Sequence, residues 1–415
     1  MKRLLSFFLL LLLGAGCKKT EHQYTVVCDF PLLFRGQAWL VVTNDAATIL
    51  QIFDLPQGAT QFIGKFNLEA DHAPDTYNLH LVFKSDTYPD SKVASYYGVQ
   101  NGAAVSFWPF TLYAVLPRVT LRRLFIRGIE AVDSVIIPGN YITDVNIMYD
   151  TATQTAQIAV YLLDQADWLV RIRTSQSAPF RTLYLPQVGL NGDSTTVEWT
   201  DFLPDEHFVM LELPDSGPAD YVEVSAVEPD FKRFATLFLG MADAYQPALT
   251  PGQVAIPIPI GLHPQSHFRV RMHQGDFTAE KMFRPGEALR MDSPDLSIRS
   301  ALFSPLHTLR ILTGGHPDLV EVNILAPASN QLLPTFQWNI QGPPEAFVQM
   351  ALPDLTSLLP DLPASGLYDH SWQVTAYQYD QLDYAQLRAG FPYKGNDGRV
   401  FPIARYGLEK MTRRY

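Results

Sequence analysis

Cysteine is almost absent from this chain: two of the 415 residues are Cys, at positions 17 and 28. Two cysteines cannot build a framework of several disulfides, and no redox C-x-x-C pair or Cys-rich zinc site is present. Cys28 lies in an apolar run, residues 24–30, with no His partner or electropositive setting nearby. We therefore expect it to be a small core residue and not a reactive thiol.

Charged residues are also scarce, at 18% of the chain against about 25% in an average protein. Lys and Arg together number 31, whereas Asp and Glu number 42, which gives a formal net charge of −11. A nucleic-acid-binding protein needs a basic face, so we expect no nucleic-acid partner. Acidic residues crowd positions 193–230 without the D-x-D-x-D-G spacing of a calcium loop, and we interpret them as a solvated acidic surface.

The common catalytic signatures are missing. No H-E-x-x-H zinc helix, no G-x-S-x-G nucleophile elbow and no glycine-rich phosphate loop occurs in the sequence. We therefore predict that the protein is not an enzyme and needs no cofactor or metal. The alternative is a hydrolase whose site is assembled from residues far apart in the sequence.

Two clusters contain the right residue types in an unsuitable arrangement. His263, His267 and His273 surround two arginines, and on an extended strand His267 and His273 share a face with Arg269 and Arg271. Two guanidinium groups between two imidazoles repel a divalent metal, so we interpret this segment as an exposed polar strand face. The run at 369–371 holds Asp, His and Ser, but strand neighbours point to opposite faces and cannot form a triad.

Short alternating apolar runs separated by Pro, Gly, Asn and Asp fill the rest of the chain, a pattern typical of β-proteins. Residues 76–83 put Tyr77, Leu79, Leu81 and Phe83 on one face. Only residues 380–389 predict a substantial helix, capped by Asp380 and ended by Gly390. We therefore predict a mainly β fold of tandem β-sandwich domains with little helix.

The strand spacing over residues 118–240 resembles that of immunoglobulin-like sandwiches. Farther along, Pro-Thr-Phe-Gln-Trp at 334–338, the run at 347–352 and the run at 371–379 resemble a fibronectin type III repeat. These resemblances imply stacked sandwiches whose loops carry recognition. The predicted divisions are a signal peptide (1–16), a lipidated Cys with its tether (17–23), three β-sandwich regions (24–117, 118–245 and 246–395) and a C-terminal tail (396–415).

The N-terminal segment has the three parts of a secretory signal. Lys2 and Arg3 are followed by the apolar residues 4–13 and then by Gly14, Ala15 and Gly16. The apolar run is shorter than the roughly 20 residues of a membrane-spanning helix. The alternatives from these residues alone are an ordinary cleaved signal and a lipid-attachment signal.

A Cys directly after small residues resembles the lipobox of bacterial lipoproteins, although Gly14 stands where that motif usually has Leu. The resemblance implies that Cys17 becomes the first mature residue and carries acyl chains, for example palmitate, that hold the protein on a membrane. The polar residues 18–22 resemble the tether of Bacteroidota lipoproteins. This resemblance implies location in the bacterial cell envelope, at the outer membrane.

Aromatic residues are the remaining resource for binding. Tyr96, Tyr97 and Trp108 are the candidates for a ligand-facing platform, because rings offer flat apolar faces on which sugars stack. The alternative is that they are core residues like the other tryptophans. Five other tryptophans lie in strand-like runs and are predicted to be core residues: Trp39, Trp168, Trp199, Trp338 and Trp372.

The sequence as a whole favours a lipid-anchored cell-envelope protein that acts as a binding or scaffold protein. Its expected partners are the membrane, through the lipid, and an envelope polymer, a glycan or another envelope protein. Besides the hydrolase, the alternative is a structural or assembly subunit of a surface complex whose open sheet edges pair with another chain.

Overall fold

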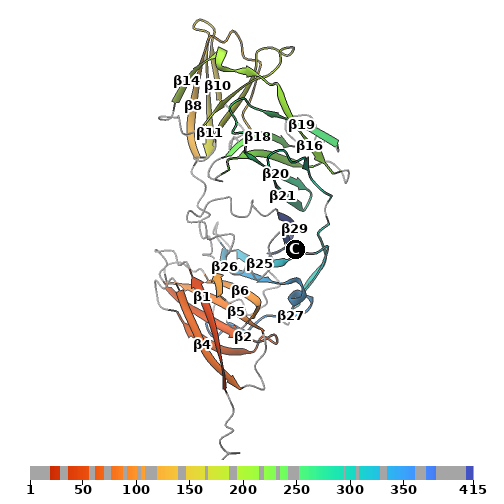
Figure 1. The fold of residues 1–415 in the computed structure, drawn as a ribbon. Coiled ribbons are helices and arrows are strands. Elements are labelled where there is room, and N and C mark those ends of the chain that lie inside the picture. Colours follow the sequence, from red (N-terminus) through yellow and green to blue (C-terminus); the bar gives the residue numbers. More distant parts are fainter. Residues whose placement is uncertain are drawn as a thin grey trace, which may run out of the picture.

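The computed structural model consists almost entirely of β-strands in the part of the chain that it describes (Figure 1). Within that part, the only helical pieces are the short 3-10 helices η3 (Trp199–Asp201) and η4 (Pro344–Val348). The predicted mainly β fold is confirmed, whereas the helix predicted at 380–389 lies outside the described residues. The structure describes residues 19–28, 36–55, 61–69, 76–86, 91–100, 104–107, 119–138, 146–163, 167–186, 194–214, 219–229, 234–241, 252–293, 295–304, 308–327, 334–359, 371–379 and 408–414.

The N-terminal unit contains two sheets at one end of the molecule (Figure 1). Alternate residues of β5, among them Tyr77, Leu79 and Leu81, are buried with Leu40 and Val42 of β2 in one core. The strands are β1 (Lys19–Cys28), β2 (Gly36–Thr43), β3 (Ile49–Asp54), β4 (Gln61–Glu69), β5 (Thr76–Ser85), β6 (Ser91–Gln100) and β7 (Ala104–Phe107).

The second unit is a sandwich of two four-stranded sheets, ordered β10-β11-β8-β14 and β15-β13-β12-β9. Its core takes Ile126 and Ile158 from the first sheet and Trp168, Ile172 and Leu183 from the second. The strands are β8 (Val119–Arg127), β9 (Ser134–Ile136), β10 (Asn146–Asp150), β11 (Thr155–Leu163), β12 (Trp168–Arg173), β13 (Arg181–Leu185), β14 (Ser194–Glu198) and β15 (Leu203–Pro204).

The third unit packs the sheet β19-β16-β22 against strands β18, β17, β20 and β21. Leu211, Ile256 and Leu289 from the first sheet meet Val224 and Val270 from the second in its core. The strands are β16 (His207–Leu213), β17 (Tyr221–Val227), β18 (Phe234–Met241), β19 (Gly252–Ile258), β20 (His267–Gln274), β21 (Phe277–Phe283) and β22 (Leu289–Arg290).

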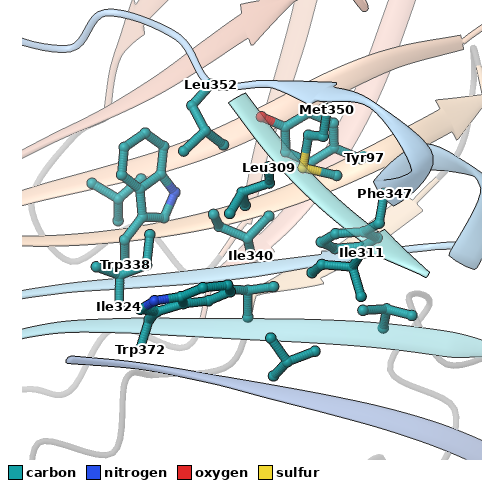
Figure 2. Close-up of a cluster of buried hydrophobic side chains, with 14 of the residues drawn as sticks. Tyr97, Leu309, Ile311, Ile324, Trp338, Ile340, Phe347, Met350, Leu352 and Trp372 are labelled. Atoms are coloured by element: carbon teal, nitrogen blue, oxygen red, sulfur yellow. The ribbon is translucent and has the colours of Figure 1, made fainter. Parts of the chain in front are cut away.

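The fourth unit packs the sheet β23-β24-β27 against β25, β26 and β28. Figure 2 shows its core, in which Trp338 and Trp372 lie on the same side of the cluster as Ile324 and face the residues around Leu309 and Met350. The strands are β23 (Ser297–Ser304), β24 (Thr308–Gly314), β25 (Leu319–Pro327), β26 (Pro334–Gly342), β27 (Met350–Ala351), β28 (Ser371–Tyr379) and β29 (Leu408–Arg414), the last of which follows the unit in sequence.

One twelve-stranded sheet joins three of these units, in the order β18-β17-β20-β21-β29-β28-β25-β26-β6-β5-β2-β3. Two pairings far apart in sequence make it continuous. Strand β26 of the fourth unit pairs with β6 of the N-terminal unit in parallel, and β29 pairs with both β21 and β28. As a result, the fourth unit lies between the N-terminal and third units, and the molecule is elongated, with the second unit at the far end (Figure 1).

The sheets divide the chain differently from the predicted domain ranges. The boundary expected between residues 245 and 246 falls inside the third unit, because β16 pairs with β19 and β17 pairs with β20 across it. Strands of the predicted region 118–245 therefore belong to two units, as do those of 246–395. The C-terminal tail predicted over residues 396–415 is wrong for β29, which is a strand paired on both sides.

Candidate functional site

The residues predicted to carry the site do not come together. Cys17 and Trp108 lie outside the described residues. Tyr96 and Tyr97 are neighbours on β6 and are 6% and 4% exposed. Tyr96 belongs to the core of the N-terminal unit and Tyr97 to that of the fourth unit. The interpretation of these two rings as a ligand-facing platform is therefore wrong, because sheets cover both faces of β6.

Three of the five predicted core tryptophans are buried: Trp168, Trp338 and Trp372. Trp39 and Trp199 are half-buried and pack against the cores of the fourth and second units. The strand prediction for residues 267–273 is also confirmed, as β20.

The histidine strand is not the exposed polar face that the sequence indicated. Arg269 on β20 is buried and its Nη2 donates to Glu223 Oε1 at 2.7 Å, while Arg271 Nε donates to Glu280 Oε2 at 2.9 Å. Burial raises the pKa of Glu223, but the two arginines outweigh it and hold that pKa below its usual value. Glu223 also lies in the acidic stretch, so the interpretation of that whole stretch as solvated is wrong at this residue.

Asp205 is a second exception in the acidic stretch. Arg171 Nη2 donates to its Oδ2 at 2.6 Å, and the carboxylate side chain is largely buried. The hydroxyl of Thr182 donates to the other carboxylate oxygen. Glu223 on β17 and Asp205, which follows β15, each form an ion pair with an arginine of another strand, a role that local acidic composition does not reveal.

A further group of partly buried polar side chains lies in the long sheet, around Glu321 on β25. Asn323 and Gln341 donate to the two carboxylate oxygens of Glu321, at 2.6 and 3.0 Å. Burial raises the pKa of Glu321 and lowers that of Lys410 on β29, where the charge of Arg271 lowers it further. The hydrogen bonds of Glu321 run along β25 and to β26, so this polar group belongs to the interior of the long sheet and is not our candidate site.

A second polar network lies inside the sheet, where the N-terminal and fourth units meet. His80 on β5 has Nδ1 2.7 Å from Ser95 Oγ and Nε2 2.9 Å from Thr43 Oγ1. Trp338 Nε1 on β26 donates to the same Ser95 oxygen at 2.7 Å. Complete burial lowers the pKa of His80 to about 3, so the imidazole is neutral. This network joins the two units and has no access to solvent.

The candidate site is the outer face of the sheet β19-β16-β22. Along β16 the side chains alternate: Val209, Leu211 and Leu213 point into the core, whereas Phe208, Met210 and Glu212 are exposed. Phe208 is 51% and Met210 43% exposed. Large apolar side chains in a line on an open sheet face are a feature of binding surfaces.

Glu212 marks the polar end of this line. It lies in register between Gln253 on β19 and Arg290 on β22, and Gln253 Nε2 donates to its Oε1 at 3.4 Å. With Asp292 and Ser293, these residues line an open cavity of about 330 Å³ at the strand ends. That volume is within the usual range for small-molecule sites.

The cavity lining contains charged groups of both signs. Asp292 Oδ2 lies 3.3 Å from Lys281 Nζ, and its Oδ1 lies 3.9 Å from Arg290 Nε. The lining therefore holds the carboxylates of Glu212 and Asp292 and one cation, Arg290, while Lys281 pairs with Asp292 from outside the lining. Donors and acceptors are both present. This composition favours a neutral ligand rich in hydroxyl groups over a strongly charged one.

The sequence contains one signal for this face, the carboxylate of Glu212. Residues 208–213 are apolar on both sides of the strand except for Glu212, so the hydrophobic pattern alone does not say which side faces solvent. The charged side chain of Glu212 indicates the solvent side of β16, and Phe208 and Met210 lie on the same side of the strand.

Neither a metal site nor a membrane span is found in the residues that the structure describes. No group of three or more His, Cys, Asp or Glu there is arranged to hold a metal ion. No helix among them is long and apolar enough to cross a bilayer.

No family model matches the chain, and neither does any curated protein. Similar solved structures include the Bacillus anthracis TIE protein, with 10% identity over 66% of this chain and a TM-score of 0.15. This chain spans 50% of the length of that protein.

Two other similar structures are a family 26 carbohydrate-binding module of Eubacterium rectale Amy13K in complex with maltoheptaose and the four N-terminal immunoglobulin domains of Dscam1 isoform 4.44. The first has 7% identity and covers 42% of this chain and 90% of its own. The second has 9% identity and covers 95% and 99%. Both TM-scores are 0.15, too low to carry an argument, so the β-sandwich assignment rests on the strands and cores described above.

Proposed function

We propose that this protein is a lipid-anchored cell-envelope protein that binds a glycan or related envelope polymer on the outer face of β19-β16-β22. The observation that carries the proposal is the line from exposed Phe208 and Met210 to the polar cavity at Glu212. A strand rises about 3.4 Å per residue, so Phe208 and Glu212 are roughly 13 Å apart along β16. Apolar faces of sugar rings pack on the first part of this line, and hydroxyl groups bond at its polar end.

The continuous sheet supports a scaffold role for the rest of the chain. Because it links three units through backbone hydrogen bonds, the units form a stiff support instead of separate domains on flexible linkers. On this proposal, the support holds the binding face away from the lipid anchor.

Substitution of Phe208 tests the site. We expect Phe208→Ala to weaken binding about tenfold, since loss of one ring contact of about 1.4 kcal/mol has that effect. The measurement is sedimentation of the full-length protein with purified peptidoglycan sacculi, and affinity electrophoresis in soluble starch, mannan and xylan. Leu302→Ala is the matched control, because Leu302 is also a large exposed apolar residue but lies on β23 in the fourth unit. Absence of binding to every polymer, or equal effects of both variants, contradicts the proposal.

The proposal includes binding without catalysis. The polymer that binds is expected to be recovered at its original chain length after prolonged incubation. Shortened chains, lost on Glu212→Gln, would instead support the alternative of a hydrolase with Glu212 and Asp292 as its carboxylates.

The lipid anchor has its own test. We expect mass spectrometry of the N-terminal peptide from the membrane fraction to show acyl chains on Cys17. Cys17→Ser should move the protein out of that fraction, because several acyl chains, at about 0.8 kcal/mol per buried methylene, supply the membrane affinity. Cys28→Ser is the matched control and should leave the protein in the membrane fraction. A mature protein with unmodified Cys17 would remove the anchor from the proposal.

A further inference from the structure

Strand β10, residues Asn146–Asp150, lies at the edge of its sheet in the second unit. Its register is with β11 on one side, and no described strand pairs with it on the other. Four of its five residues are exposed, including Ile147 at 39% and Met148 at 52%. The second unit forms the far end of the elongated molecule, so this edge is clear of the long sheet (Figure 1).

Natural proteins usually protect an edge strand with Lys, Pro or a bulge, because its unpaired N–H and C=O groups otherwise attract another strand. The sequence of β10, Asn-Ile-Met-Tyr-Asp, contains neither Lys nor Pro, and its ladder with β11 runs without a bulge. Tyr161, on β11 two residues beyond the part that pairs with β10, adds a further exposed apolar side chain to this sheet. Together with the exposed Ile147 and Met148, these features indicate an edge strand that can pair with a strand of another chain.

The order of the residues in β10 identifies the partner. Read in either direction, the strand runs polar, apolar, apolar, apolar, polar. In an antiparallel pair of two copies centred on Met148, Asn146 of one copy lies opposite Asp150 of the other, and Ile147 lies opposite Tyr149. The amide of Asn146 then meets a carboxylate, and apolar groups meet apolar groups on both faces.

We propose that β10 is an interface for a second copy of this chain, formed by antiparallel pairing of the two β10 strands about a twofold axis at Met148. The two sheets β10-β11-β8-β14 then become one eight-stranded sheet. A self-complementary edge gives a closed, isologous dimer, the commonest symmetry of soluble oligomers. Asp150 retains its local role in this arrangement, since its side chain accepts hydrogen bonds from Ala152 N and Thr153 Oγ1 in the adjoining turn.

Disulfide trapping in intact cells that produce the full-length chain tests the pairing, in a Cys28→Ser background. Opposed residues of an antiparallel pair have Cα atoms 4.5–5.5 Å apart, within the range that a disulfide spans. Met148→Cys is therefore expected to give a covalent dimer upon oxidation. Asn146→Cys is the matched control: its own copy lies about four residues away along the strand, roughly 13 Å, so at least tenfold less dimer is expected.

Two further experiments test whether the two β10 strands are antiparallel and whether the dimer depends on the β10 edge. Cells that produce one chain with Asn146→Cys and another with Asp150→Cys should yield the mixed dimer. Adding Ile147→Lys to Met148→Cys should reduce the trapped dimer at least tenfold, because an edge Lys opposes pairing; Ile147 is exposed, so the variant is expected to fold. A monomeric Met148→Cys chain, or equal trapping at positions 146 and 148, would overturn the proposal, as would capture of a different protein at Met148→Cys.

Discussion

Acidification from pH 6.5 towards pH 3 is expected to cost the folded protein on the order of 4 kcal/mol through one side chain, His80. The imidazole is fully buried in β5, and burial lowers its pKa to about 3, from about 6.5 in the unfolded chain. Between these two values the unfolded chain binds one more proton than the folded chain. Stability is then fully present above pH 6.5 and falls by roughly 1.4 kcal/mol for each pH unit below it.

Urea unfolding at a series of pH values between 7.5 and 4 measures this dependence. His80→Gln is expected to be less stable than the parent at pH 7.5, because the bonds to Ser95 and Thr43 are disturbed, and the difference should shrink as the pH falls. Carboxylates that titrate over the same range are common to both proteins and cancel in the comparison. His316→Gln is the matched control, since His316 is exposed, and its profile should follow that of the parent. A difference between parent and His80→Gln that stays constant with pH would refute the account of His80.

Proline at position 412 is expected to destabilise the protein by about 3 kcal/mol or more. Thr412 lies within β29, and its N–H donates to the carbonyl of Asp276 at 2.9 Å. Proline has no N–H to donate, and a strand paired on both sides does not tolerate it. Because β29 is the connection between β21 and β28, we also expect the long sheet to separate into two parts that unfold independently.

Thr412→Val is the control that keeps the backbone donor. It removes only the hydroxyl contact with Thr375 Oγ1, at 3.1 Å, and should cost about 1 kcal/mol. Differential scanning calorimetry distinguishes the two variants by the number and position of their transitions. Equal melting profiles for Thr412→Pro and Thr412→Val would show that β29 does not hold the two parts together.

Local strand structure was largely predictable, because it depends on alternation over a few residues. The runs at 76–83 and 267–273 correspond to β5 and β20. Burial was harder to predict. His80 and Arg269 look like solvent-facing positions in their strands, yet each lies in a hydrogen-bonded network that depends on other strands. A polar residue on an alternating strand is a signal of exposure only when nothing packs on that face.

The connections between units were not predictable from the sequence. The pairing of β6 with β26 depends on a match between strands in different units, and no local pattern marks it. The same is true of β29, whose basic residues read as a tail although Lys410 is half-buried among strands. The candidate binding face on β16 was partly predictable, because Glu212 marks the outward side of the strand but not the cavity beside it.

Strands β6 and β26 pair in the folded protein but are synthesised at very different times. Ser95 and Trp338, which bond across it, are 243 residues apart. At 5–20 residues per second, a ribosome needs about 12 to 50 s to make the intervening chain. Throughout that interval the nascent β6 has no β26 beside it, so the edge of β6 that β26 covers in the folded protein stays unpaired until the last third of the chain is made.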